Sequence, residues 1–96
     1  MEDKSVRWRV LFSGQVQRVG FRYTAYYLAR DLGLSGWAKN LDDGRVEMEI
    51  QGRPSQIRKL LLRLKAQPQL KIAGMEIQSV PVRPFERRFR VLGSST

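Results

Sequence analysis

The sequence contains no cysteine and no histidine among its 96 residues. Without cysteine there is no disulfide framework, no thiol nucleophile and no thiolate ligand for a transition metal. Without histidine the chain lacks the commonest general base and the commonest metal ligand. These absences remove most nucleophilic and metal-assisted mechanisms, and we expect neither a metal nor any other cofactor.

Long apolar segments are absent as well. No run approaches the roughly 18 residues of a membrane-spanning helix, and residues 1–5 lack the apolar stretch of a secretory signal. We therefore expect no membrane span and a cytoplasmic location. With 96 residues and 42% hydrophobic content, the chain predicts one domain over residues 1–96, and nothing in it requires more than a monomer.

Hydrophobic periodicity predicts strands and helices in the order βαββαβ, with a short last strand. This order is typical of an α+β, ferredoxin-like sandwich, in which an antiparallel sheet carries both helices on one face. Such a fold alone identifies no function. The expected strands are residues 6–12, 36–40, 46–51, 75–78 and 89–91, and the expected helices are residues 21–32 and 54–67.

The most informative segment runs from Gly14 to Arg22 and joins the first strand to the first helix. Backbone N–H groups of a short glycine-containing loop and the unpaired amides of a helix start favour an anion. Arg22, in the first helical turn, adds a planar charged fork suited to two phosphate oxygens. We interpret the segment as a phosphate-binding loop; the alternative is an ordinary connection with a solvated arginine.

A second segment, residues 36–52, contains an Asp43-Gly44 turn between two strands and predicts a hairpin. Asn40 falls at the end of the first strand of that hairpin, where it either bonds its own backbone or carries a function. Asp42 and Asp43 lie in the turn and are expected to be solvated. No carboxylate is therefore an obvious general base.

The two segments together resemble the signatures of the acylphosphatase family, small enzymes that hydrolyse the carboxyl–phosphate mixed anhydride. The first is similar to G-x-V-Q-G-V-x-F-R and the second to G-[aromatic]-A-x-N-x-x-x-G-x-V-x5-G, and the resemblance covers about residues 5–92. The matched residues are Gly14, Val16, Gln17, Val19, Phe21 and Arg22 in the first segment, and Gly36, Trp37, Ala38, Asn40, Gly44, Val46 and Gly52 in the second.

The resemblance implies that Arg22 and the loop amides hold a phosphate while Asn40 orients the attacking water. It also implies a small acyl phosphate as substrate, so inorganic phosphate and sulfate are expected to compete for the site. The loop residues in question are Gln15, Val16, Gln17, Arg18 and Val19.

Hydrolysis of an acyl phosphate is a reaction suited to a chain that has no histidine, no cysteine and no obvious general base. The leaving group of an acyl phosphate is a carboxylate, whose conjugate acid has a pKa of roughly 4–5, so it departs without protonation. Phosphoryl transfer then requires mainly positioning and charge stabilisation. The substrate-assisted route that the resemblance suggests lets the phosphate itself accept the proton of the water.

Arg18 departs from the family pattern, which has glycine at that position. If the loop requires a positive φ there, an arginine adds strain of about 1–2 kcal/mol and displaces the amides. Alternatively, the guanidinium folds over the site and adds affinity for anions, or it points into solvent. The first alternative predicts that Arg18→Gly raises the turnover rate.

Charge supports a rival function, since 18 Lys and Arg against nine Asp and Glu give a formal charge of +9. Ferredoxin-like domains that bind RNA stack bases on aromatic side chains of a sheet face. Here Trp8, Phe12 and Phe89 are expected on the helix side, so we expect no specific nucleic acid. Binding to a membrane surface and a regulatory module without activity are further alternatives. The arginines expected on the outer surface of the sheet are Arg7, Arg9, Arg87, Arg88 and Arg90.

Overall fold

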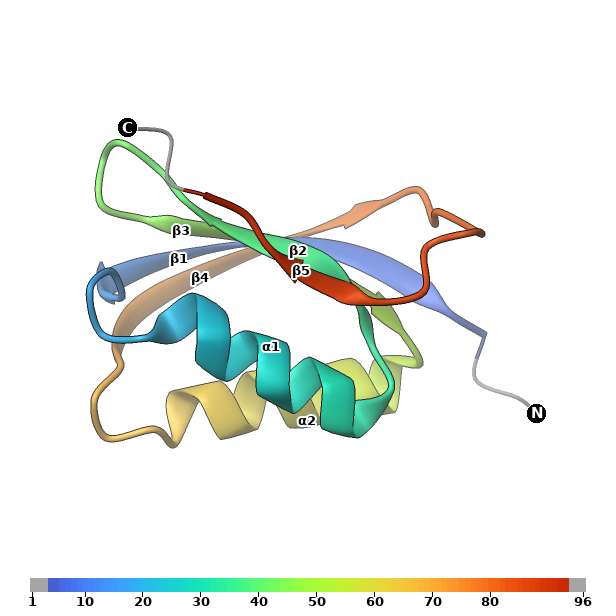
Figure 1. Cartoon of the computed structure of the whole chain (residues 1–96), viewed down its shortest axis with the longest axis horizontal. Coiled ribbons are helices and arrows are strands. Elements are labelled where there is room, and N and C mark those ends of the chain that lie inside the picture. The colour runs from blue at the N-terminus through green and yellow to red at the C-terminus, as the bar shows by residue number, and fades with distance from the viewer. Residues whose placement is uncertain (1–3, 94–96) are drawn as a thin grey trace.

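The computed structural model describes residues 4–93. Its five strands form one sheet in the order β4-β1-β3-β2-β5, and both helices cover the same face of it (Figure 1). This arrangement confirms the ferredoxin-like α+β fold predicted from the sequence. The elements are β1 (Val6–Gln15), α1 (Phe21–Leu32), β2 (Ser35–Asn40), β3 (Val46–Gly52), α2 (Pro54–Lys65), β4 (Lys71–Val80) and β5 (Phe89–Val91).

One edge of the sheet differs from the antiparallel arrangement that we predicted. β5 runs parallel to β2, with Phe89 opposite Gly36 and Val91 opposite Ala38, whereas the other neighbouring strands are antiparallel. The reason is the path of the chain. β4 runs opposite to β2 at the other edge of the sheet, and residues 81–88 cross over and reverse direction, so the returning strand runs parallel to β2. The sheet is therefore mixed.

The core lies between the helices and the sheet. Val10, Phe12 and Phe89 are buried on the helix side, as predicted, and Trp8 is partly buried against them. The ring centroids of Phe12 and Phe21 lie 4.7 Å apart. Because Phe12 precedes the loop and Phe21 follows it, this contact fixes both ends of the loop. The predicted inner stripe of α2 is buried in full, at Ile57, Leu60, Leu61 and Leu64.

Within residues 4–93, neither helix is long and apolar enough to cross a membrane.

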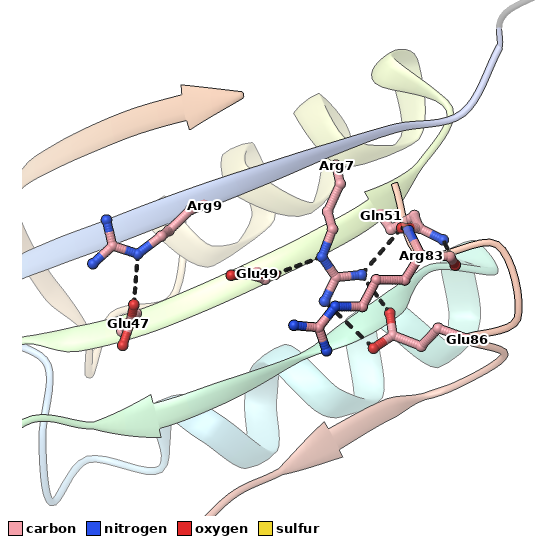
Figure 2. Close-up of polar contacts among 7 residues, drawn as sticks. All are labelled: Arg7, Arg9, Glu47, Glu49, Gln51, Arg83 and Glu86. Carbon is pink, nitrogen blue, oxygen red and sulfur yellow. Dashed lines mark hydrogen bonds and ion pairs between the residues drawn. The ribbon is translucent and has the colours of Figure 1, made fainter. Parts of the chain in front are cut away.

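Arg7 lies on the outer face of the sheet, as predicted, but the rest of the chain buries it there. Arg7 is only 1% exposed. Its guanidinium donates to Glu49 Oε1 at 2.6 Å, to Gln51 Oε1 at 3.1 Å and to Glu86 Oε1 at 2.7 Å (Figure 2). The sequence did not indicate this burial, because the segment that covers Arg7, residues 81–88, is remote from it along the chain.

Gln51 fastens the same segment through the backbone of Arg83. Its Nε2 donates to the Arg83 carbonyl at 2.8 Å, and its Oε1 accepts the Arg83 amide at 2.8 Å. The outer-face clamp thus consists of Arg7, Glu49, Gln51, Arg83 and Glu86. It holds the crossover between β4 and β5 against the sheet.

Arg9 also has a carboxylate partner, since its Nε lies 2.6 Å from Glu47 Oε2 (Figure 2). Two of the five arginines expected to form a basic outer surface, Arg7 and Arg9, are therefore neutralised within the chain. A sheet face whose cations are already paired is a weak site for the phosphates of a nucleic acid. The structure thus weakens the nucleic-acid alternative for this face.

The clamp shifts the pKa of Glu86. Burial by itself raises the pKa of this carboxyl, but hydrogen bonds from Arg7 and Ser35 and the charges of Arg7 and Arg83 outweigh burial, so the pKa lies below its ordinary value. A carboxyl whose pKa is lower in the folded chain stabilises the fold above its unfolded pKa. That contribution disappears as the pH falls through the folded pKa.

Arg7→Ala should lower the free energy of unfolding by about 3 kcal/mol, because Glu49 and Glu86 then lose their partner in a largely buried site. Arg9→Ala is the matched control on the same strand. Its side chain is 36% exposed, so its loss should cost less than about 1 kcal/mol. Urea unfolding followed by circular dichroism measures both values. Equal losses in the two variants would contradict the argument from burial.

The contribution of Glu86 should depend on pH. The difference in free energy of unfolding between the wild type and Glu86→Gln should stay constant near neutral pH and shrink below the unfolded pKa of about 4.3. Urea unfolding of both proteins between about pH 7 and pH 3 tests this expectation. A difference that stays constant over the whole range would show that the folded and unfolded pKa values of Glu86 are equal.

Candidate active site

Segments far apart in the sequence meet at one end of the sheet (Figure 1). Figure 1 shows the blue loop between β1 and α1 at the same end as the green turn between β2 and β3. Asn40, the last residue of β2, lies opposite Val46, and Val46 lies opposite Phe12 near the end of β1. The strand pairing therefore brings Asn40 to the end of the sheet that carries the predicted phosphate-binding loop.

The loop and the start of α1 offer N–H donors to an anion. α1 begins after Gly20, no side chain caps its first turn, and that turn contains no acidic residue. Within residues 4–93, the amides of Gln17, Arg18 and Val19 donate no hydrogen bond to a backbone carbonyl. The first amides of a helix also lack intrahelical partners. Together with the positive end of the helix dipole, these groups favour a bound anion.

Gln17 ties the loop to the β2–β3 turn. Its Nε2 donates to the carbonyl oxygens of Leu41 at 2.7 Å and Arg45 at 2.9 Å. Leu41 directly follows Asn40, so the two bonds hold the loop beside the end of β2. The sequence predicted Gln17 only as a residue of the phosphate-binding loop and gave no role to its side chain. The role of its side chain depends on the packing of two distant segments.

The other predicted loop residues have different surroundings. Val16 is fully buried in the core, and Val19 packs against the core from a partly buried position. Gln15 ends β1, is exposed and lies opposite Lys71 of β4. Arg18 is exposed. The loop therefore has a fixed inner side and an open outer side.

Arg22 is oriented by the end of the chain's last strand. Its Nη1 donates to the carbonyl oxygen of Leu92 at 2.5 Å, and the Leu92 amide donates to Ala38 of β2 at 2.9 Å. Ala38 is two residues before Asn40, so the guanidinium is anchored close to the end of β2. A guanidinium has five N–H donors, and the bond to Leu92 orients the group while using one of them. The sequence did not predict that Leu92 contacts Arg22. The contact uses the backbone carbonyl of Leu92, which every residue type has, so the residue type gives no indication of it.

The turn carboxylates are poor candidates for a general base. Asp42 and Asp43 are exposed, as expected for a turn. Asp43 accepts hydrogen bonds from the amide of Arg45 at 3.1 Å and from its Nε at 2.9 Å. The backbone hydrogen bond above all, with the Arg45 side chain, lowers the pKa of Asp43, and a lower pKa makes a carboxylate a weaker base. Within the described residues, no group of three or more Asp and Glu side chains could hold a metal ion.

Comparison with known proteins decides the family. The acylphosphatase family model matches residues 8–91, most of the chain. The chain belongs to the acylphosphatase family.

Individual acylphosphatases are similar over nearly their whole length. The protein from Geobacillus thermodenitrificans is 42% identical over 87 residues, which cover 90% of this chain and 93% of that protein. The protein from Geobacillus kaustophilus is 42% identical over 90 residues, 93% of this chain and 96% of that one. The crystal structure of the acylphosphatase from Bacillus subtilis matches with a TM-score of 0.83 and 31% identity, over 91% of this chain and 98% of that one. The family and enzyme class predicted from the two motifs are confirmed.

Arg18 differs from the acylphosphatase loop pattern, which has glycine at this position, and its backbone conformation is unusual for a residue with a side chain. Its φ is 65°, and among residues 4–93 no other non-glycine residue has a positive φ. A side chain with a Cβ is disfavoured in this left-handed region, where glycine is not. The sequence predicted strain at Arg18 if the loop requires a positive φ there, and the structure has a positive φ at this residue.

Arg18→Gly should raise the free energy of unfolding by about 1 kcal/mol, because relief of the left-handed strain outweighs the greater chain entropy of glycine. Arg18→Ala is the control, since it removes the charge and keeps a Cβ in the same conformation. It should give no gain. Urea unfolding measures both variants, and an equal gain in Arg18→Ala would attribute the effect to charge instead of strain.

Proposed function

We propose that this acylphosphatase-family chain hydrolyses the carboxyl–phosphate bond of acyl phosphates to a carboxylate and inorganic phosphate. The observation that carries the proposal is the convergence of the two family motifs at one end of the sheet. Arg22 and the loop amides hold the phosphate, and Asn40 orients the attacking water. The loop residues are Gln15, Val16, Gln17, Arg18 and Val19.

The contacts of the candidate site support these roles. Phosphoryl transfer spreads negative charge over the equatorial oxygens of the phosphate in the transition state. Donors that are already oriented stabilise such charge without reorganisation. The bond from Arg22 to Leu92 and the two bonds from Gln17 to the β2–β3 turn provide this orientation.

A protein base is not required for this reaction. The carboxylate leaves unprotonated because its conjugate acid has a pKa of roughly 4–5, and the phosphate accepts the proton of the water. The engagement of Asp43 with Arg45 agrees with a mechanism that uses no turn carboxylate. We further propose that residues 1–96 work as one domain and as a cytoplasmic monomer, without a metal or other cofactor. Inorganic phosphate and sulfate then act as competing anions.

Hydrolysis of benzoyl phosphate in metal-free buffer tests the proposal. Asn40→Ala should lower kcat about 100-fold with little change in KM, because a misplaced water affects the transition state and not substrate binding. Arg22→Ala should lower kcat/KM and weaken inhibition by inorganic phosphate. The control is Arg53→Gln, which should change neither kcat nor KM. Arg53 is exposed and follows Gly52, which pairs with Val6 at the opposite end of the sheet.

Two outcomes would contradict these roles. A folded wild-type protein that does not hydrolyse benzoyl phosphate would overturn the proposed activity and favour a binding or regulatory module. If Asn40→Ala keeps the wild-type kcat and raises KM, Asn40 binds substrate and does not orient water. Circular dichroism and urea unfolding of each variant separate these outcomes from a loss of fold.

A further inference from the structure

We propose that Arg18 is a specificity-determining residue that favours acyl phosphates whose acyl group carries a second negative charge. This inference rests on the proposed function and names a substrate class for the same site. It uses three observations: the open position of the Arg18 side chain, its strained backbone, and the charges around the loop.

The neighbours of Arg18 have side chains committed to the protein. Val16 is buried, Gln17 bonds the carbonyls of Leu41 and Arg45, and Val19 packs against the core. Arg18 is exposed, and within the described part of the chain its guanidinium takes part in no hydrogen bond or ion pair. Its charged end is therefore directed away from the core, on the open side of the loop.

The backbone of Arg18 is strained without a visible gain inside the protein. Its φ of 65° places a Cβ in the left-handed region, and no contact of the exposed side chain offsets this. Strain of this kind is maintained by the surrounding structure, and it concentrates at active sites and ligand-binding sites. Since glycine relieves the strain, the property that arginine adds at this position is its charge.

The charges around the loop indicate the ligand group. Both carboxylates of the β2–β3 turn have partners within the protein, since Arg45 engages Asp43 and Asp42 is not free either. On the other side of the loop, Lys71 lies opposite Gln15 and is exposed. When the loop amides and Arg22 hold the reacting phosphate as proposed, we expect the acyl group to extend outward past Arg18 and Lys71. A carboxylate or second phosphate on that acyl group meets the Arg18 guanidinium, whose planar fork suits such groups.

A pair of substrates that differ by one carboxylate tests the inference. The quantity to measure is the ratio of kcat/KM for 4-carboxybenzoyl phosphate to kcat/KM for benzoyl phosphate. Differences in intrinsic reactivity cancel when this ratio is compared between variants. The ratio should fall about three- to fivefold in Arg18→Gly and Arg18→Asn, because an exposed ion pair contributes about that factor. High salt should lower the wild-type ratio toward that of the variants.

Three variants separate the effect of the Arg18 charge from the effect of its backbone conformation and from the effect of the net charge of the protein. Arg18→Asn removes the charge with a residue that tolerates the left-handed region, so a fall shared with Arg18→Gly reflects charge. Arg18→Lys keeps a cation and should keep at least half of the preference. Arg53→Gln removes one exposed arginine at the opposite end of the sheet and should leave the ratio unchanged.

The possible failures are distinguishable. If the wild type hydrolyses benzoyl phosphate and the ratio is the same in all Arg18 variants, the inference is wrong and the proposed function stands. An equal fall in Arg53→Gln would also overturn it, because net charge would then account for the preference. If the folded wild type hydrolyses neither substrate, the proposed function fails and the inference fails with it.

Discussion

Antiparallel pairing between β1 and β3, from Val6 opposite Gly52 to Phe12 opposite Val46, holds the two halves of the candidate site together. The loop that we propose to bind phosphate follows β1, and Asn40 ends β2, which pairs with the other side of β3. A change in the register of β1 against β3 would move the loop away from Asn40 and turn inward residues outward. The bonds from Gln17 to the β2–β3 turn act on top of this pairing and set the final position of the loop.

The two faces of the sheet contribute in different ways. The inner face packs on the helices, and the contact between Phe12 and Phe21 fixes the ends of the loop. The outer face uses the clamp around Arg7 to hold the crossover from β4 to β5 (Figure 2). β5 in turn ends beside Ala38, and Leu92 orients Arg22. A buried ion pair on one face is thus connected, through the chain, to a guanidinium on the other side of the molecule.

An enzyme without histidine or cysteine depends on the placement of its donors. In the proposed site, backbone amides, one arginine and one asparagine provide no strong base and no nucleophile, so an activated substrate is the suitable one. At Arg18, side-chain charge and loop backbone conformation are combined in a single residue. In the proposed site, its charge lies on the same short loop whose amides bind the phosphate, and its φ is 65°. In our proposals, loop geometry and substrate preference are therefore linked at this residue.

The sequence by itself determined the two helices, the strand order along the chain, the buried stripe of α2 and the two motifs, because local periodicity and turn residues encode these features. It also indicated the consequence of a positive φ at Arg18. Only the tertiary structure decided that β5 runs parallel to β2, that residues 81–88 bury Arg7, and that Leu92 anchors Arg22. These features arise from contacts between segments that are far apart along the chain, and some of them use backbone atoms, which carry no side-chain signal.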